Sequence, residues 1–291
     1  MTLGRQIEYL LMRTVMAIFS ALPLDTASSV GGSGARILGP FTRLHTRART
    51  HLMRVFPSLS EKEAKKILRD MWDNLGRNLA EYPHLQEIAA TRVVFENHAG
   101  MTTASLLQGP AIFISGHFAN WEIAGPALLH TMNVPLHLLY RAANNRRVDE
   151  QLNNYRSMKG RLPTIPKSRG GMRHMIGLLK DNQKIGILID QKYNEGLTLP
   201  FFGIPAPSSD AYVQLGQKFS CPVYPAQIIR LKGAHFRVIV HPPLTLLTPD
   251  GQNRPAADVV AEAHALLEEW IKQAPAQWLW VHRRWGKDFN P

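Results

Sequence analysis

The strongest constraint on the fold is an alternation of strand-like and helix-like segments that begins near residue 93. Apolar runs of about four to eight residues indicate buried strands, and longer stretches with helical spacing indicate helices. Because strands separated by helices usually pair in parallel, the pattern predicts an α/β fold with a largely parallel sheet flanked by helices. Strands are expected at residues 111–115, 135–140, 184–190, 223–230 and 236–241, and helices at 121–131, 147–159, 171–181, 209–219 and 256–273.

The first 90 residues read as helices throughout. The charge-free apolar stretch from Thr14 to Leu24 is shorter than the roughly 20 residues that a membrane-spanning helix needs. The basic segment from Arg43 to Arg54 suits a helix on anionic headgroups. We therefore predict an N-terminal helical membrane-docking region over residues 1–90 and an α/β domain over residues 91–291. A buried core helix or a signal peptide is the alternative for the apolar stretch.

Two local patterns refine the helical region. The small-residue patch Gly31–Gly34 does not follow a strand, so it predicts close helix packing or a bend rather than a phosphate loop. Ser60 followed by Glu63 is a capping box and predicts that a helix begins there.

The chain has 34 basic and 22 acidic residues, a net charge of +12. This excess favours an anionic partner such as a membrane surface or an acidic protein. There is no long Lys/Arg run and no aromatic and basic RNA motif, so nucleic acid is not expected. Cys221 is the single cysteine, and the histidines lack metal-ligand spacing, so neither a disulfide nor a metal or other cofactor is predicted.

A histidine and a carboxylate with four residues between them, His117 and Glu122, follow the predicted strand at residues 111–115. Positions five apart on one helix point about 140° away from each other, so the two side chains meet only if the chain turns between them. Gly116 permits a turn, and Asn120 suits a helix cap. A carboxylate that fixes the tautomer leaves the other ring nitrogen free to act as a general base. We therefore predict His117 as a general base oriented by Glu122; a structural histidine at a helix N-terminus is the alternative.

Polar residues also follow two other predicted strands, which places them at the carboxyl edge of the sheet. Arg141 follows one, and Asp190 and Gln191 follow another. Arg156, on an intervening helix, offers a planar fork for a phosphate or a carboxylate. Because a buried carboxylate needs a partner, we predict an ion pair between Arg156 and Asp190. Arg141, Arg156, Asp190 and Gln191 are the candidate substrate-binding residues.

Two aromatic segments have two interpretations each. The segment 199–205 has a loop composition, and it either lines a groove for an acyl chain or plugs the core. The segment 277–285 joins tryptophans to basic residues, which suits a membrane interface or packing on the core.

Five segments, taken together, resemble those of one known family. They are Gly116–Glu122, Tyr140-Arg141, Asp190-Gln191, Phe201–Gly203 and Trp280–Trp285. Their order is similar to that in the late acyltransferases of lipid A biosynthesis, the lauroyl and myristoyl transferases of Gram-negative bacteria. The resemblance covers about residues 5–286.

The resemblance implies a glycerolipid-acyltransferase-like fold. It implies transfer of a fatty acyl chain from acyl carrier protein to a hydroxyl of a lipid A precursor, at the cytoplasmic face of the inner membrane. It carries the functional histidine and acid of the family onto His117 and Glu122, its arginine onto Arg156 and its aspartate onto Asp190. No activated nucleophile is evident, so direct attack of the acceptor oxygen on the thioester is expected. A glycerophospholipid or glycolipid acyltransferase with a different acceptor, and a non-catalytic basic membrane-binding protein, remain the alternatives.

Overall fold

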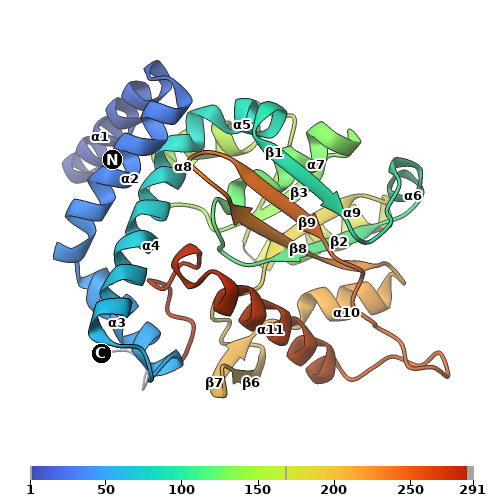
Figure 1. Ribbon diagram of the computed structural model, residues 1–291. Helices are drawn as coiled ribbons and strands as arrows, with labels where there is room; N and C mark the ends of the chain where they lie inside the picture. The colour runs from blue at the N-terminus through green and yellow to red at the C-terminus, as the bar shows by residue number, and fades with distance from the viewer. Residues whose placement is uncertain (1, 168, 287–291) are drawn as a thin grey trace.

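A computed structural model describes residues 2–167 and 169–286. A seven-stranded sheet in the order β1-β9-β8-β2-β5-β3-β4 forms the centre, and helices cover both of its faces (Figure 1). The strands are β1 (Val93–Asn97), β2 (Ala111–Ser115), β3 (Leu136–Tyr140), β4 (Thr164–Pro166), β5 (Lys184–Leu188), β6 (Leu197–Phe201), β7 (Ile204–Ser208), β8 (Val223–Arg230) and β9 (Phe236–Val240). The helices are α1 (Leu3–Ala21), α2 (Leu24–Leu38), α3 (Arg43–Val55), α4 (Glu61–Glu81), α5 (Leu85–Thr91), α6 (Thr103–Gln108), α7 (Ala124–Met132), α8 (Arg146–Arg156), α9 (Arg169–Lys180), α10 (Ala211–Lys218) and α11 (Ala256–Gln273). Short 3-10 turns are η1 (Gly39–Phe41), η2 (Tyr82–His84), η3 (Trp121–Ile123) and η4 (Pro275–Gln277).

The predicted α/β architecture is confirmed. Strands β8, β2, β5, β3 and β4 run parallel, β9 is antiparallel to β8, and β1 pairs in parallel with β9. All five predicted strands and all five predicted helices are present, with ends within a few residues of those expected. The structure adds β1, β4 and the two-stranded hairpin β6–β7.

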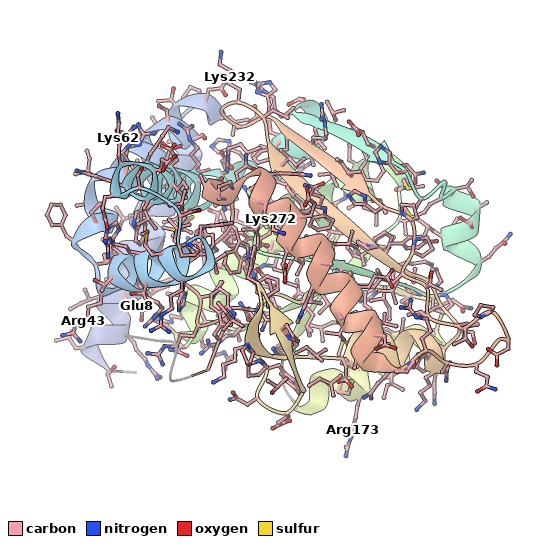
Figure 2. The ribbon with its side chains drawn as sticks, turned by 60° about the horizontal axis from the view of Figure 1, so that its bottom comes forward. Glu8, Arg43, Lys62, Arg173, Lys232 and Lys272 are labelled. Carbon is pink, nitrogen blue, oxygen red and sulfur yellow. The ribbon has the colours of Figure 1, made fainter. Side chains whose placement is uncertain are left out.

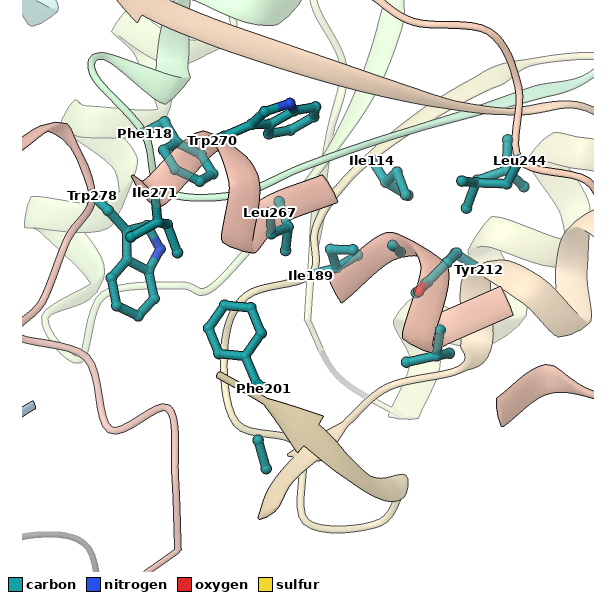
Figure 3. Close-up of a cluster of buried hydrophobic side chains, with 14 of the residues drawn as sticks. Ile114, Phe118, Ile189, Phe201, Tyr212, Leu244, Leu267, Trp270, Ile271 and Trp278 are labelled. Atoms are coloured by element: carbon teal, nitrogen blue, oxygen red, sulfur yellow. The ribbon is translucent and has the colours of Figure 1, made fainter. Parts of the chain in front are cut away.

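The central strand β2 is buried on both faces, as its unbroken apolar run requires. Ile112 and Ile114 point to the core under α10 and α11, whereas Phe113 points to the core under α6 and α7. Figure 3 shows Leu267 and Trp270 of α11 in the first of these cores. Because β2 is buried along its whole length, the backbone at its carboxyl end is held in place, and so are the first residues that follow it.

The two aromatic segments pack on the core. Phe201 is fully buried, and the left-handed backbone of Phe202 and Gly203 turns β6 into β7. This segment is therefore a hairpin that packs over the core, in agreement with the second interpretation. The tryptophans of the C-terminal segment are also buried, so their assignment to a membrane interface was wrong. They are Trp278, Trp280 and Trp285.

The first 90 residues are helical, as predicted, and the capping box formed by Ser60 and Glu63 is present. Leu68, Met71 and Trp72 of α4 lie in the same core as the central strands. The all-helical part before residue 90 and the α/β part after it therefore share one hydrophobic core. Across residues 2–167 and 169–286, no helix combines the length and the apolar character needed to cross a bilayer.

The small-residue patch lies where α2 crosses α4, as its composition predicted. A Cβ atom on Gly76 would lie 2.1 Å from the Gly31 carbonyl oxygen and 2.5 Å from the Ala35 Cβ. We expect Gly76→Val to lower the free energy of unfolding by about 1–3 kcal/mol, because the two backbones must separate. A Cβ atom on Gly34 would have no neighbouring side chain or backbone within 4 Å, so Gly34→Ala should be neutral or stabilising. Urea denaturation of both variants checks this, and equal losses would contradict the close crossing.

Candidate active site

The register of the sheet brings His117 and Asp190 together. Ser115 at the end of β2 pairs with Leu188 at the end of β5. The next hydrogen bond, from the Ile189 N–H to the Ser115 carbonyl at 2.9 Å, continues the ladder. Two residues beyond the paired strand ends, His117 and Asp190 therefore lie side by side at the carboxyl edge of the sheet.

Asp190 holds His117 through two hydrogen bonds. Its Oδ1 lies 2.7 Å from His117 Nδ1, and its Oδ2 accepts from the His117 backbone N–H at 2.7 Å. The Trp278 indole N–H donates to the same Oδ2 at 2.8 Å. Burial alone would raise the pKa of Asp190, but the adjacent His117 outweighs it and holds this pKa far below its usual range.

The ionised Asp190 fixes the tautomer of the histidine. With a carboxylate at Nδ1, this nitrogen carries the proton, and Nε2 keeps its lone pair. Gln191 Nε2 lies 3.2 Å from His117 Nε2, so the Gln191 amide donates to that lone pair. The arrangement suits a general base whose reactive nitrogen is covered by a polar side chain.

Glu122 does not contact His117 by a hydrogen bond, which corrects the predicted pair. It accepts two hydrogen bonds from Arg156, both of 2.8 Å, and one from the Tyr82 hydroxyl at 2.6 Å. After His117 the backbone turns through Ala119, whose φ is +46°, and then enters η3. This turn carries Glu122 toward α8 instead of back to the histidine.

Arg156 is likewise bound by a different partner from the one predicted. Its guanidinium pairs with Glu122, not with Asp190, and lies against the rings of Tyr82 and Tyr140 at 5.9 and 4.9 Å. Burial would raise the pKa of Glu122, but the charge of Arg156 and its hydrogen bonds hold this pKa below its usual value. A guanidinium whose fork is bound to a carboxylate braces the wall of the site and is not free for a phosphate.

The loop after His117 is held by polar side chains of α4 that the sequence analysis missed. The Ala119 carbonyl accepts from the side-chain amides of Asn74, at 3.0 Å, and Asn78. Arg230 of β8 in turn bonds both asparagines and Glu81. A signal was present, because positions 74, 78 and 81 share one face of a helix that is otherwise apolar there.

A second histidine was also missed as a site residue, although the C-terminal motif contains it. The centre of the His282 ring lies 4.5 Å from that of the His117 ring, and the Trp121 ring lies 4.9 Å from the His117 ring. Burial, together with the nearby His117, lowers the pKa of His282 to about 3. His282 is therefore a neutral ring that packs against the base.

The remaining predicted site residues lie around this centre. Arg141 follows β3 and is exposed, and Gln191 is half-buried beside His117.

Cys221 is buried, and burial raises the pKa of its thiol to about 11, which is unfavourable for a nucleophile. Within the described part of the chain, no group of three or more His, Cys, Asp or Glu side chains is arranged to hold a metal ion.

Comparisons with known proteins agree with the resemblance that the five segments indicate. A family model described as bacterial lipid A biosynthesis acyltransferase matches residues 3–287. The chain is similar to the lipid A biosynthesis palmitoleoyltransferase of Escherichia coli (strain K12) and to the lipid A biosynthesis acyltransferase of Shigella flexneri. Each is 24% identical over 283 residues, which cover 93% of this chain and 88% of the relative.

Proposed function

The chain belongs to the bacterial lipid A biosynthesis acyltransferases, and we propose that it transfers a fatty acyl chain from acyl carrier protein to a hydroxyl of a lipid A precursor. The family match over nearly the whole chain supports the reaction class. The observation that carries the mechanism is the placement of the His117 ring, whose Nδ1 lies 2.7 Å from Asp190 Oδ1 and whose Nε2 lies 3.2 Å from the Gln191 amide nitrogen.

In this mechanism, Nε2 of His117 removes the proton from the acceptor hydroxyl. The acceptor oxygen attacks the thioester carbonyl, and Asp190 stabilises the imidazolium that forms. Collapse of the tetrahedral intermediate breaks the carbon–sulfur bond, and the imidazolium returns the proton to the departing thiolate. The acceptor hydroxyl takes the place of the Gln191 amide at Nε2, which leaves that amide beside the developing oxyanion. Glu122 and Arg156 position the wall of the site.

The direct test offers two acceptors to the purified enzyme with acyl carrier protein donors, one of them palmitoleoyl because a relative is named for that chain. We expect transfer to a tetra-acylated lipid A precursor and little transfer to lysophosphatidic acid. The opposite preference would indicate a glycerophospholipid acyltransferase. Binding of both lipids without any transfer would favour a non-catalytic membrane protein.

We also propose that the N-terminal helices dock the enzyme on the cytoplasmic face of the inner membrane. On α1 the exposed apolar side chains are at positions 3, 7, 10, 11 and 18, which lie along one side of the helix, as is typical of an interfacial helix. We call the exposed apolar side chains of α1, α2, η1 and α3 the apolar docking surface. Its members are Leu3, Ile7, Leu10, Leu11, Ile18, Val30, Ile37, Leu38, Phe41 and Leu44.

Basic residues border this surface but are not confined to it. Arg43 projects outward from the start of α3, while Lys62 and Lys232 project from other parts of the molecule (Figure 2). The apolar side chains, rather than the overall charge, therefore select the face that meets the bilayer. Their burial in lipid is worth about 1.5–3 kcal/mol for each large side chain.

We expect Leu10→Glu/Leu11→Glu to reduce binding to vesicles of phosphatidylethanolamine and phosphatidylglycerol at least roughly tenfold, because charges replace buried apolar groups. The matched control is Leu107→Glu/Leu247→Glu, which changes one exposed leucine of α6 and one of the segment between β9 and α11, both elements being distant from α1 in Figure 1. Flotation of both variants measures the effect, and equal binding would contradict the docking surface. Point variants are preferable to removal of residues 1–24, because Met16 and Leu24 are buried.

A further inference from the structure

A second group of charged side chains follows the same edge of the sheet beyond Asp190. Tyr140 of β3 pairs with Pro166 of β4, and the Lys167 N–H donates to the Tyr140 carbonyl at 2.8 Å. Arg141 and Lys167 therefore follow the aligned ends of two adjacent parallel strands. Desolvation lowers the pKa of Lys167, and the nearby Arg141 lowers it further.

Two more cations approach the site from elements outside the sheet. Arg47 of α3 donates from Nη1 to the Val281 carbonyl at 3.3 Å, which places its guanidinium next to the C-terminal segment. Partial burial lowers the pKa of Arg47, and Arg283 adds to the effect. Arg47 and Arg141 both act electrostatically on His282, the ring that packs against the base. Arg141 and Lys167 therefore lie beyond the ends of β3 and β4, and Arg47 and Arg283 lie at the C-terminal segment that carries His282.

Among the acidic side chains that the structure describes, none is paired with this group. In the part of the chain that the structure describes, none of the four forms an ion pair within 4.0 Å. The two buried acids nearby have other partners, since Asp190 binds His117 and Glu122 binds Arg156. We call the four side chains the cationic cluster; they are Arg47, Arg141, Lys167 and Arg283.

Uncompensated like charges repel one another and attract an anionic ligand. We infer that the cationic cluster binds a phosphate monoester of the acceptor lipid and thereby places the acceptor hydroxyl at His117 Nε2. This inference deepens the proposed function and rests on it. A phosphate monoester carries close to two negative charges at neutral pH, whereas the phosphodiester of a carrier arm carries one, so a cluster of four cations suits the monoester better. Three of the four are arginines, whose planar forks bind phosphate oxygens in pairs.

The test compares two variants that each remove two positive charges. Arg141→Gln/Lys167→Gln changes the cluster, and Lys62→Gln/Lys232→Gln changes two exposed lysines elsewhere on the surface (Figure 2). With the phosphorylated acceptor, we expect the KM of the cluster variant to rise roughly tenfold or more and that of the control to change little. With the same lipid after phosphatase treatment, the wild type and the cluster variant should have similar KM values.

Two further measurements are needed. The first shows whether the bound phosphate belongs to the acceptor lipid or to the carrier arm, and the second tests the phosphate site independently of the acyl-transfer reaction. If the KM for acyl carrier protein rises instead, while that for an acyl-pantetheine thioester without phosphate does not, the cluster binds the carrier arm and the acceptor assignment is overturned. Binding of the phosphorylated and dephosphorylated lipids to the His117→Ala protein, measured by titration calorimetry in detergent micelles, does not depend on turnover. Equal binding of the two lipids overturns the site whether or not the wild type transfers acyl chains. Phosphate-dependent binding in a wild-type protein that transfers no acyl chain would retain the site and reject the reaction.

Discussion

Replacing His117 with alanine is expected to reduce acyl transfer by roughly 10²–10⁴-fold, because the reaction loses its general base. Asp190→Asn should cause a comparable loss while the histidine remains in place. An amide at this position no longer stabilises the imidazolium, and it favours the tautomer with the proton on Nε2. The turnover number with saturating acylated carrier protein and saturating lipid A precursor measures both effects.

A matched control for this experiment is His130→Ala, since His130 is exposed on α7. Circular dichroism should show that all three variants are folded. Activity close to wild type in a folded His117→Ala protein would reject the mechanism. A severe loss in His117→Ala with normal activity in Asp190→Asn would keep the base but reject its orientation by Asp190.

The second large effect concerns the buried ion pair of Glu122 and Arg156. Arg156→Gln leaves the Glu122 carboxylate buried without its cation, and we expect the free energy of unfolding to fall by about 3–5 kcal/mol. Glu122→Gln should cost a similar amount. The double variant Glu122→Gln/Arg156→Gln should cost less than the sum, because neither uncompensated charge remains. Denaturation in urea gives all of these values.

A second double-mutant cycle discriminates between the observed pairing and the predicted one. Arg156→Gln and Asp190→Asn change residues with separate partners, so their losses of stability should be nearly additive. Strong coupling in this cycle, with additive losses for Glu122 and Arg156, would support the ion pair that the sequence suggested. Near-normal stability of Arg156→Gln would show that the buried pair contributes little.

The positions of the site residues along the chain were predictable, whereas their partners were not. Hydrophobic runs mark where β2 and β5 end, so His117 and Asp190 were expected at the carboxyl edge of a sheet. The strand order, with β2 directly beside β5, depends on how the crossover helices pack and leaves no local signal. The nearer carboxylate in the sequence, Glu122, was therefore chosen over the one that is nearer in space.

The same distinction applies to the support of the site. The composition of α4 predicted a helix and its apolar side, but not that Asn74 and Asn78 hold the carbonyl of Ala119. The exposure of the apolar side chains on α1 and the burial of Trp278, whose indole N–H bonds Asp190, were likewise visible only in the tertiary structure.

Taken by itself, the sequence determined the alternation of strands and helices, the residues at the strand ends and the family resemblance. These features follow from local periodicity, backbone preferences and the order of short motifs along one chain. Only the tertiary structure decided that Asp190 holds His117 and that Arg156 pairs with Glu122. It also showed that the four cations of the cluster form no ion pair with any acid in residues 2–167 and 169–286. Those pairings depend on sheet order, on register and on a left-handed turn at Ala119, which together bring residues distant in the chain within hydrogen-bonding distance.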